Sequence, residues 1–341
     1  MGFMKYFILA VWLGSAAAAV AEPQSRQIPT EEIVIDLNRT AEYQYVFAGA
    51  LQASTDAAPG QVGMDCDVMG CVGPFGAGSD AKGNIYILDQ VNRRIQKYDN
   101  KFKFLEVIVE DKKKDVYFGN SLAVDSRGRL LFFARASELW DIEQGKVKRV
   151  DISELTKKLH SGKPGEQIFC RIRLFGDEMP WLVCEGGGSN PIVRAHAVYS
   201  DAQFSGPKNE LSTAIRADGK AVSMFLSSGV IKEIRLPPKN TESAKTIRFS
   251  AEVRTHGEIF IDPKGFIYFE TLGNGGQSRI IALRPDGNLH RIYEQHNGVT
   301  LYQNIGFLGN DESIFTLSEI SEENDCKTTK WIPVLNGRGD R

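Results

Sequence analysis

A turn that recurs about every 45 residues constrains what this chain can fold into more than any other feature of its sequence. In each copy an aspartate is followed within a few residues by a glycine, and then by an apolar run rich in β-forming residues. Four copies are plain: DAKGNIYIL (80–88), DSRGRLLFF (125–133), ADGKAVSMF (217–225) and DPKGFIYFE (262–270). Their glycines, Gly83, Gly128, Gly219 and Gly265, stand 45, 91 and 46 residues apart, so the period predicts a further copy between the second and the third.

Two weaker copies complete the series. RLFGDEMPWLVCE (173–185) fills the gap around Gly176, and GFLGNDESIFTLSE carries the period on to Gly309. Each copy predicts a β-hairpin turn, because aspartate bonds the backbone at the start of a turn and glycine adopts the positive φ that closes it. Further strands are predicted after the turn, such as RIQKYD (94–99) and FLEVIV (104–109) in the first copy.

Four strands in about 45 residues, repeated six times, are typical of a blade array. We therefore expect an all-β fold, a six-bladed β-propeller with four-stranded blades. ISELTKKL (152–159) is the one short helical candidate. Strands predicted in EEIVIDL (31–37) and YQYVFAGAL (43–51) precede the first blade. We expect an N-terminal strand to complete the last blade and so close the ring, which removes an exposed sheet edge.

The first residues have the pattern of a secretory signal. Lys5 is followed by an apolar core from Tyr6 to Leu13 and by small residues that end in Ala19-Val20-Ala21. We expect cleavage after Ala21, which leaves 22–341 as a single propeller domain that is secreted or periplasmic. The apolar run is shorter than the roughly 20 residues of a spanning helix. No later stretch approaches that length without charges, so no membrane span is expected.

Charge excludes one class of partner. The chain has 41 basic and 43 acidic residues, and without Lys5 the balance is 40 against 43. A nearly neutral, slightly acidic chain lacks the positive field that attracts nucleic acid or an anionic membrane. We therefore expect a protein or a small molecule as the partner.

One segment resembles a known family. GPFGAGSDAKGNIYILDQVNRRIQKYDNKFKFLEVI (73–108) is similar to one blade of an NHL-repeat propeller. The similarity lies in the strand Gly83-Asn84-Ile85-Tyr86, in Asp89 at its end, and in Asn92-Arg93-Arg94-Ile95 before the next strand; the other copies match in part. Relatives of this shape include binding modules, lactonases of the senescence-marker type and streptogramin lyases, so the resemblance implies a fold and not a function.

The five cysteines suggest two disulfides and one remaining thiol in an exported chain. Cys170 and Cys184 flank the hairpin centred near Gly176, so they should face each other at a Cα separation of about 4.5–5.5 Å, which suits a disulfide. Cys66 and Cys71 predict a local disulfide that shapes the loop GMDCDVMGCVGPFGAG (63–78). Cys326 remains as a free thiol, and its pairing with one of the loop cysteines stays open.

The candidate site lies on the face where the second strand of each blade ends. Four loops there are elaborated, at 63–73, 185–191, 271–278 and 319–326. Carboxylates at or near these strand ends are expected to project near the mouth of the central tunnel. The ligand-binding candidates are Asp65, Asp67, Asp89, Arg93, Glu185, Asn190, His256, Glu270, Asn274 and Glu319.

A divalent cation is the one cofactor that these carboxylates suggest. A ring of Asp89, Glu185 and Glu270 resembles the Glu, Asn and Asp set with which the lactonase relatives hold a cation. The favoured interpretation is nevertheless a solvated rim, because the second and fourth blades place Ala134 and Phe225 at this level. Asp65 and Asp67 lack the remaining ligands of a calcium loop.

Three functions follow in order of preference. The first is an exported propeller that binds a protein or small-molecule partner through its elaborated loops. The second is a metal-dependent hydrolase or lyase that uses the carboxylates at the mouth, and the third is a structural scaffold of an envelope assembly. No residue is assigned a catalytic role, since none of the five histidines stands in a recognisable nucleophile motif.

Overall fold

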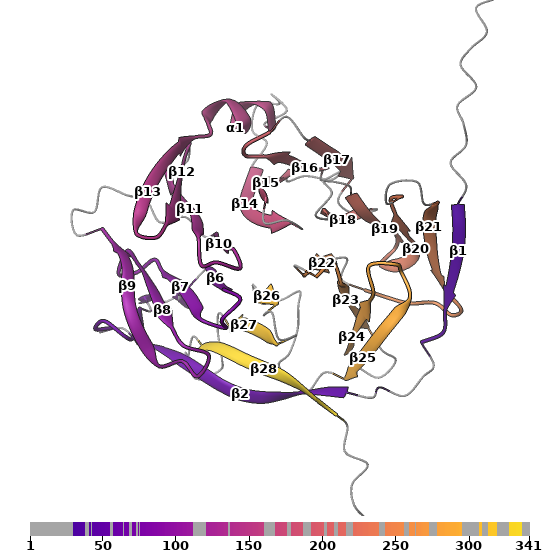
Figure 1. Cartoon of the computed structure of the whole chain (residues 1–341), viewed down its shortest axis with the longest axis horizontal. Helices are drawn as coiled ribbons and strands as arrows, with labels where there is room; N and C mark the ends of the chain where they lie inside the picture. Colours follow the sequence, from indigo (N-terminus) through magenta and orange to yellow (C-terminus); the bar gives the residue numbers. More distant parts are fainter. Residues whose placement is uncertain are drawn as a thin grey trace, which may run out of the picture.

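Strands dominate the computed structural model of the chain, and they are arranged around a common centre as a β-propeller (Figure 1). The structure describes residues 30–37, 41, 43–54, 57–63, 65–67, 70–72, 74, 76–111, 121–135, 137–159, 168–175, 179–186, 192–200, 203–207, 211–215, 221–238, 243–255, 259–262, 264–272, 278–294, 307–308, 313–318 and 327–335. Their one helix is α1 (Ser153–Leu159), which confirms the helical candidate of the sequence. No helix in this part of the chain is long and apolar enough to cross a membrane.

Five consecutive four-stranded antiparallel meanders make up most of the ring, and we call them blades 1 to 5. Blade 1 has β6 (Gly76–Ser79), β7 (Ile85–Asp89), β8 (Arg94–Tyr98) and β9 (Phe104–Glu110); blade 2 has β10 (Leu122–Val124), β11 (Leu130–Arg135), β12 (Glu138–Glu143) and β13 (Lys146–Asp151). Blade 3 has β14 (Ile168–Phe175), β15 (Met179–Gly186), β16 (Ile192–Ala197) and β17 (Gln203–Pro207). Blade 4 has β18 (Leu211–Ile215), β19 (Ala221–Ser227), β20 (Val230–Leu236) and β21 (Ala244–Phe249); blade 5 has β22 (Ile259–Ile261), β23 (Ile267–Leu272), β24 (Ser278–Leu283) and β25 (Leu289–Glu294).

A closing blade follows blade 5 and contains both ends of the chain. It consists of β26 (Phe307–Leu308), β27 (Ile314–Ser318) and β28 (Lys327–Leu335), with β2 (Tyr43–Ser54) as its outer strand. β2 runs antiparallel to β28, from the pair Tyr43 and Leu335 to the pair Gln52 and Lys327. The predicted closure by an N-terminal strand is confirmed, and the count of six blades stays a prediction.

The hairpin turns form as the repeat predicts. Gly83, Gly128 and Gly265 have φ values of 80°, 86° and 85°. In the first turn the Oδ1 atom of Asp80 accepts hydrogen bonds of 2.9 Å from the backbone N–H groups of Lys82 and Asn84. Asp125 and Asp262 accept equivalent backbone hydrogen bonds in their own turns. The predicted turns at Gly176, Gly219 and Gly309 lie outside the described residues.

The strand predicted at 31–37 does not belong to the closing blade. β1 (Thr30–Ile35) pairs in parallel with β21 and adds a fifth strand to blade 4. The start of β2 then pairs in parallel with β25 of blade 5, and β3 (Val62–Gly63) pairs with the end of β2. We call residues 30–63 the N-terminal strap, because its described parts run along the outer strands of blades 4 and 5, complete the closing blade and reach blade 1 (Figure 1).

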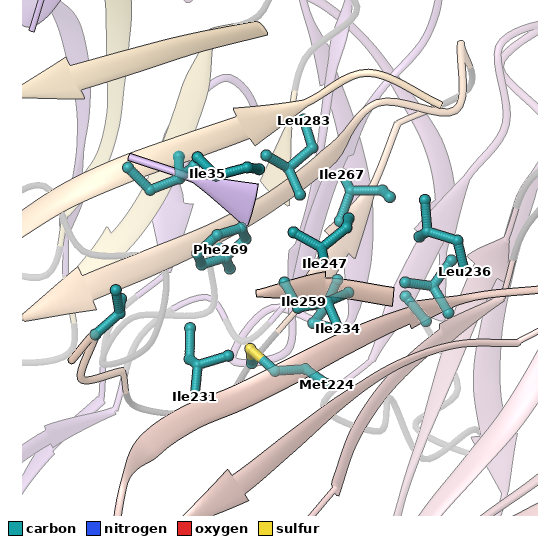
Figure 2. Packing of buried hydrophobic residues seen from close by; sticks show 14 of the residues in the cluster. Ile35, Met224, Ile231, Ile234, Leu236, Ile247, Ile259, Ile267, Phe269 and Leu283 are labelled. Atoms are coloured by element: carbon teal, nitrogen blue, oxygen red, sulfur yellow. The ribbon is translucent and has the colours of Figure 1, made fainter. Parts of the chain in front are cut away.

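Hydrophobic clusters join most neighbouring blades. The largest lies between blades 4 and 5, with Met224 and Ile234 on one side, Ile267 and Phe269 on the other, and Ile35 of the strap inserted beside them (Figure 2). Similar clusters join blades 1 and 2, blades 2 and 3, blade 5 and the closing blade, and the closing blade and blade 1. Among the described residues no such cluster joins blade 3 to blade 4 across the seam between them.

Candidate functional site

The loop face is the face where the second strand of each blade ends, and at blade 1 the N-terminal strap covers it. Asp89 ends β7 there and is fully buried. Its Oδ2 atom accepts a hydrogen bond of 2.9 Å from Nε of Arg94, and both oxygens accept further hydrogen bonds from Asn92. Arg94 also donates from Nη2 to the backbone oxygens of residues 57, 58 and 61 of the strap.

Close backbone packing reinforces this attachment. A Cβ atom on Gly63 would lie 2.7 Å from Oδ1 of Asp89 and 2.2 Å from Nδ2 of Asn92, so a larger residue there would force the side chains of this network to shift. Gln96 donates to the backbone oxygen of Gln61 at 2.7 Å and accepts from the N–H of Gly60 at 2.8 Å. Asp89 was expected as a carboxylate facing the tunnel mouth, but its pairing with Arg94 makes it an anchor for the strap.

Glu270 lies elsewhere than a ring of mouth carboxylates requires. It is 4% exposed in β23, where strand alternation places it on the same face as Tyr268, which packs against the closing blade. Counted from the turn glycines, Glu270 corresponds to Leu88 of blade 1, and Asp89 corresponds to Thr271. The two carboxylates therefore lie on opposite faces of their blades, and no group of three metal-ligating side chains is found in the described part of the chain.

The remaining candidates are placed only in part. Arg93 has a positive φ of 52° in the β7–β8 turn and lies 4.0 Å from Asp111, at the exposed edge of blade 1. Asp65 and Asp67 lie in β4 (Asp65–Asp67), and Glu185 lies in β15, but their side chains are outside the described part. Asn190, His256, Asn274, Glu319 and Cys326 are outside it altogether.

A disulfide holds the loop-face end of blade 3. Cys170 of β14 and Cys184 of β15 are bonded across the strand pair, which confirms the predicted disulfide; their Cα separation of 4.0 Å is shorter than the expected range. The bond lies two residues before the end of β15 at Gly186. In the 63–78 loop, Cys66 stands opposite Cys71 in the β4–β5 hairpin (β5, Gly70–Val72), and their disulfide stays a prediction.

Two arginines that the sequence analysis did not single out lie on the innermost strand of blade 3. The described innermost strands read GAGS, LAV, IFCRIRLF, LSTAI, IFI and FL, so Arg171 and Arg173 are the charged residues among them. Ile172 faces blade 2, and alternation turns both arginines to the other side, toward the centre and blade 4. Their alternation within an otherwise apolar inner strand is the sequence signal that would have identified them.

The seam beside these arginines is polar on its other side too. Blade 4 buries Val222, Met224 and Ile234 against blade 5, so alternation turns Phe225, Glu233 and Arg235 toward blade 3. The Arg235 guanidinium lies 4.3 Å from the centre of the Phe225 ring and donates to Glu233 at 2.6 Å.

On the face opposite the loop face, three side chains link blades 2 and 3, and we call them the clasp: Arg129, Asp141 and Tyr199. Arg129 donates to both oxygens of Asp141, at 2.7 and 2.6 Å, and Tyr199 donates a short hydrogen bond to the same carboxylate. Burial raises the pKa of Asp141, but the hydrogen bonds from Arg129 and Tyr199 outweigh it, so the pKa lies below its ordinary value. Burial, together with the bond to Asp141, raises the pKa of Tyr199 to about 12. The clasp is a structural link rather than a site, because its charges are satisfied by one another.

The comparison with known proteins identifies solved structures of propeller type but does not identify a family for this chain. No family model and no curated protein matches the sequence. A gluconolactonase from Xanthomonas campestris is 11% identical and has a TM-score of 0.43, over 87% of this chain and 99% of that one. The calcium-binding protein regucalcin from Agrobacterium tumefaciens is 15% identical, with a TM-score of 0.43, over 84% and 93%.

Virginiamycin B lyase from Staphylococcus aureus is 12% identical, with a TM-score of 0.40, over 84% of this chain and 99% of its own. The similarity of blade 1 to an NHL-repeat propeller stays a resemblance. At such low identity the assignment of a propeller rests on the strand topology described above.

Proposed function

We propose that this protein is an exported β-propeller that binds a small-molecule or protein partner through the loops of its loop face. One observation carries the proposal: the framework beneath these loops is locked at two separate places. The Cys170–Cys184 disulfide holds the strand ends beside the loop at 187–191, and the Asp89–Arg94 pair holds the strap over blade 1. A framework fixed in advance lowers the entropy lost when a ligand is bound.

Export is part of the proposal. The signal pattern that ends at Ala21 supports it, and so does the disulfide, because such bonds persist in oxidising compartments such as the periplasm and the extracellular space. The test is N-terminal sequencing of the protein from its native host: a mature chain that begins at residue 22 supports export, and an intact N-terminus contradicts it.

Ligand binding is tested on the purified mature chain. A metabolite library is screened by thermal shift, and the ligands found are measured by calorimetry on two variants. The first deletes residues 187–189 from the loop face, and the second is Gln144→Asn in the β12–β13 turn on the opposite face. We expect the deletion to abolish binding while circular dichroism and the melting temperature stay native, and Gln144→Asn to bind normally. Equal binding by both variants contradicts the proposal.

A metal-dependent hydrolase or lyase is the second candidate, and Glu270 favours it. A carboxylate that is 4% exposed next to the loop at 273–277 is a candidate functional group, because acidic side chains are seldom buried without a structural or chemical role. The gluconolactonase and the lyase named above belong to this class, but the support in this chain is Glu270. Bound metal in the purified protein, together with lactone hydrolysis that Glu270→Gln abolishes, would establish it. If the protein hydrolyses lactones but needs neither Glu270 nor a metal to do so, this metal-dependent mechanism is excluded.

A further inference from the structure

The geometry points to an anion-binding site in the centre of the ring, formed by Arg171 and Arg173 of β14 and specific for a ligand with a carboxylate or phosphate group. This inference rests on the proposed function, since it names the chemical class of the ligand. It follows from the position of the two side chains, from their charge and from the composition of the strands around them.

The side chain of Arg173 lies where a ligand in the centre of the ring could reach it. The Arg173 guanidinium lies over the Phe260 ring, 5.6 Å from its centre. Arg173 belongs to β14 and Phe260 to β22, and β18 lies between these strands in the order of the ring, packed beside β22 (Figure 1). The side chain of Arg173 therefore extends past blade 4 into the centre of the ring. The cation–π contact holds it there, because an aromatic face attracts a cation within about 6 Å of its centre.

Arg171 stands two residues earlier on the same face of β14, roughly 7 Å away along the strand. It is exposed, and among the described residues it has no ion-pair or hydrogen-bond partner. Its neighbour across the strand pair is Val183, which offers no charge. Because both guanidinium groups lie on the same face of β14, one anion can accept hydrogen bonds from both.

The two arginines differ in charge from the residues of the other innermost strands. The other described innermost strands contribute glycine, alanine, serine, threonine and apolar residues to the centre. The buried aspartates at the far ends of β6, β10 and β22 accept the backbone hydrogen bonds of their own turns. The charged side chains that the described innermost strands contribute are therefore both positive. Guanidinium groups bind carboxylate and phosphate oxygens through paired hydrogen bonds, which sets these anions apart from chloride.

Within the described parts of blades 3 and 4, charged side chains lie on both sides of the seam, beside the buried Trp181. A ligand that enters from the loop face beside the glycine-rich loop at 187–191 would meet Arg171 before Arg173, because β14 begins at that face.

The experiment is calorimetry of the mature chain with inorganic phosphate in one arm and citrate in the other, at an ionic strength held constant with sodium chloride. We expect saturable binding in at least one arm, and the arm that binds tells phosphate from carboxylate. Arg171→Gln should weaken binding at least tenfold and Arg171→Lys less, while Arg248→Gln, on β21 of blade 4, leaves it unchanged. Arg171→Gln removes an exposed side chain without a described partner, so the fold should be retained.

The inference is overturned if neither anion binds saturably, or if Arg171→Gln binds as tightly as Arg248→Gln. Its failure is distinguishable from that of the proposed function. Library ligands that Arg171→Gln still binds and the 187–189 deletion loses would leave the proposed function standing without the anion site. Phosphate or citrate binding that needs Arg171 and survives the loop deletion would establish the anion site alone.

Discussion

The Nε atom of Arg94 donates to Oδ2 of Asp89 over 2.9 Å, and the two side chains are 5% and 0% exposed. The pair joins the end of one strand to the start of the next in blade 1, and through Arg94 it holds the strap that closes the ring. A carboxylate expected to meet a ligand is thus used to fasten the N-terminal part of the chain to the propeller.

Asp89→Asn should therefore reduce stability strongly. It leaves the buried Arg94 guanidinium without its countercharge, and breaking a buried pair in this way costs about 3–5 kcal/mol. Urea unfolding followed by tryptophan fluorescence measures the loss. Glu106→Gln is the matched control in the same blade, since it removes the exposed pair of Lys97 and Glu106 and should cost less than about 0.5 kcal/mol. Equal losses in the two variants would refute the anchoring role.

Two neighbouring residues of β1, the first strand of the strap, differ strongly in burial. Ile35 is 4% exposed and packs in the cluster between blades 4 and 5, whereas Val34 is 63% exposed. Ile35→Ala should lower the free energy of unfolding by about 2–4 kcal/mol, and Val34→Ala by only a few tenths. Chemical denaturation of both variants checks this. A small effect at Ile35 would mean that β1 contributes little to the core of blade 4.

Gly78 sets how closely two innermost strands approach. A Cβ atom there would lie 2.4 Å from Cγ2 of Val124 in blade 2 and 2.8 Å from its Cβ. Gly78→Ala should destabilise the protein by about 1–3 kcal/mol through overpacking. Adding Val124→Ala should restore part of the loss, so the double-mutant cycle should show a favourable coupling. Additive losses would show that β6 and β10 do not pack as described.

Acid should weaken the clasp between blades 2 and 3. The pKa of Asp141 is lower in the folded protein than its ordinary value of 3.8, so its contribution is complete above that value and is lost as the pH falls through the lower, folded pKa. Asp141→Asn should therefore cost about 2–3 kcal/mol at neutral pH, and the difference from wild type should shrink below about pH 4. Urea unfolding over a pH series measures both. Glu143→Gln, in an exposed pair on the same strand, should show neither effect.

The disulfide between Cys170 and Cys184 at the loop face should contribute measurably to stability. The double variant Cys170→Ala/Cys184→Ala removes a bond between residues 14 apart in sequence and should lower the free energy of unfolding by about 3 kcal/mol.

Peptide mapping of the unreduced protein should also recover Cys66 linked to Cys71 and Cys326 as a free thiol. A peptide that links Cys326 to either loop cysteine would replace that prediction with the alternative left open by the sequence.

Much of the fold follows from the sequence because its signals are local. The turns at Gly83, Gly128 and Gly265 each contain the aspartate that bonds them and the glycine that closes them, so a single short segment determines the conformation. The place of β1 is different. EEIVIDL predicts a strand, but strand propensity does not say which edge it pairs with, and β21 lies more than 200 residues away.

The site was harder to predict for the same reason. Arg94 is only five residues from Asp89, yet the backbone oxygens at 57, 58 and 61 that complete the network come from the strap. The fate of Asp89 therefore depended on a long-range contact. Arg171 and Arg173 become notable only when six short strands are compared side by side, which requires knowing that these strands surround one centre.

The pairing of β2 with β28 also has a consequence for the order of folding. Gln52 and Lys327 are partners across 275 residues of chain, so the strand that leaves the ribosome among the first must wait for one of the last. Contacts of such high sequence separation slow folding, and until they form the blades stand in an open arc with two unpaired edges, which are prone to aggregation. Completion of the ring therefore depends on a contact between the two ends of the chain, and loss of β28 would leave β2 and β27 each with an unpaired edge.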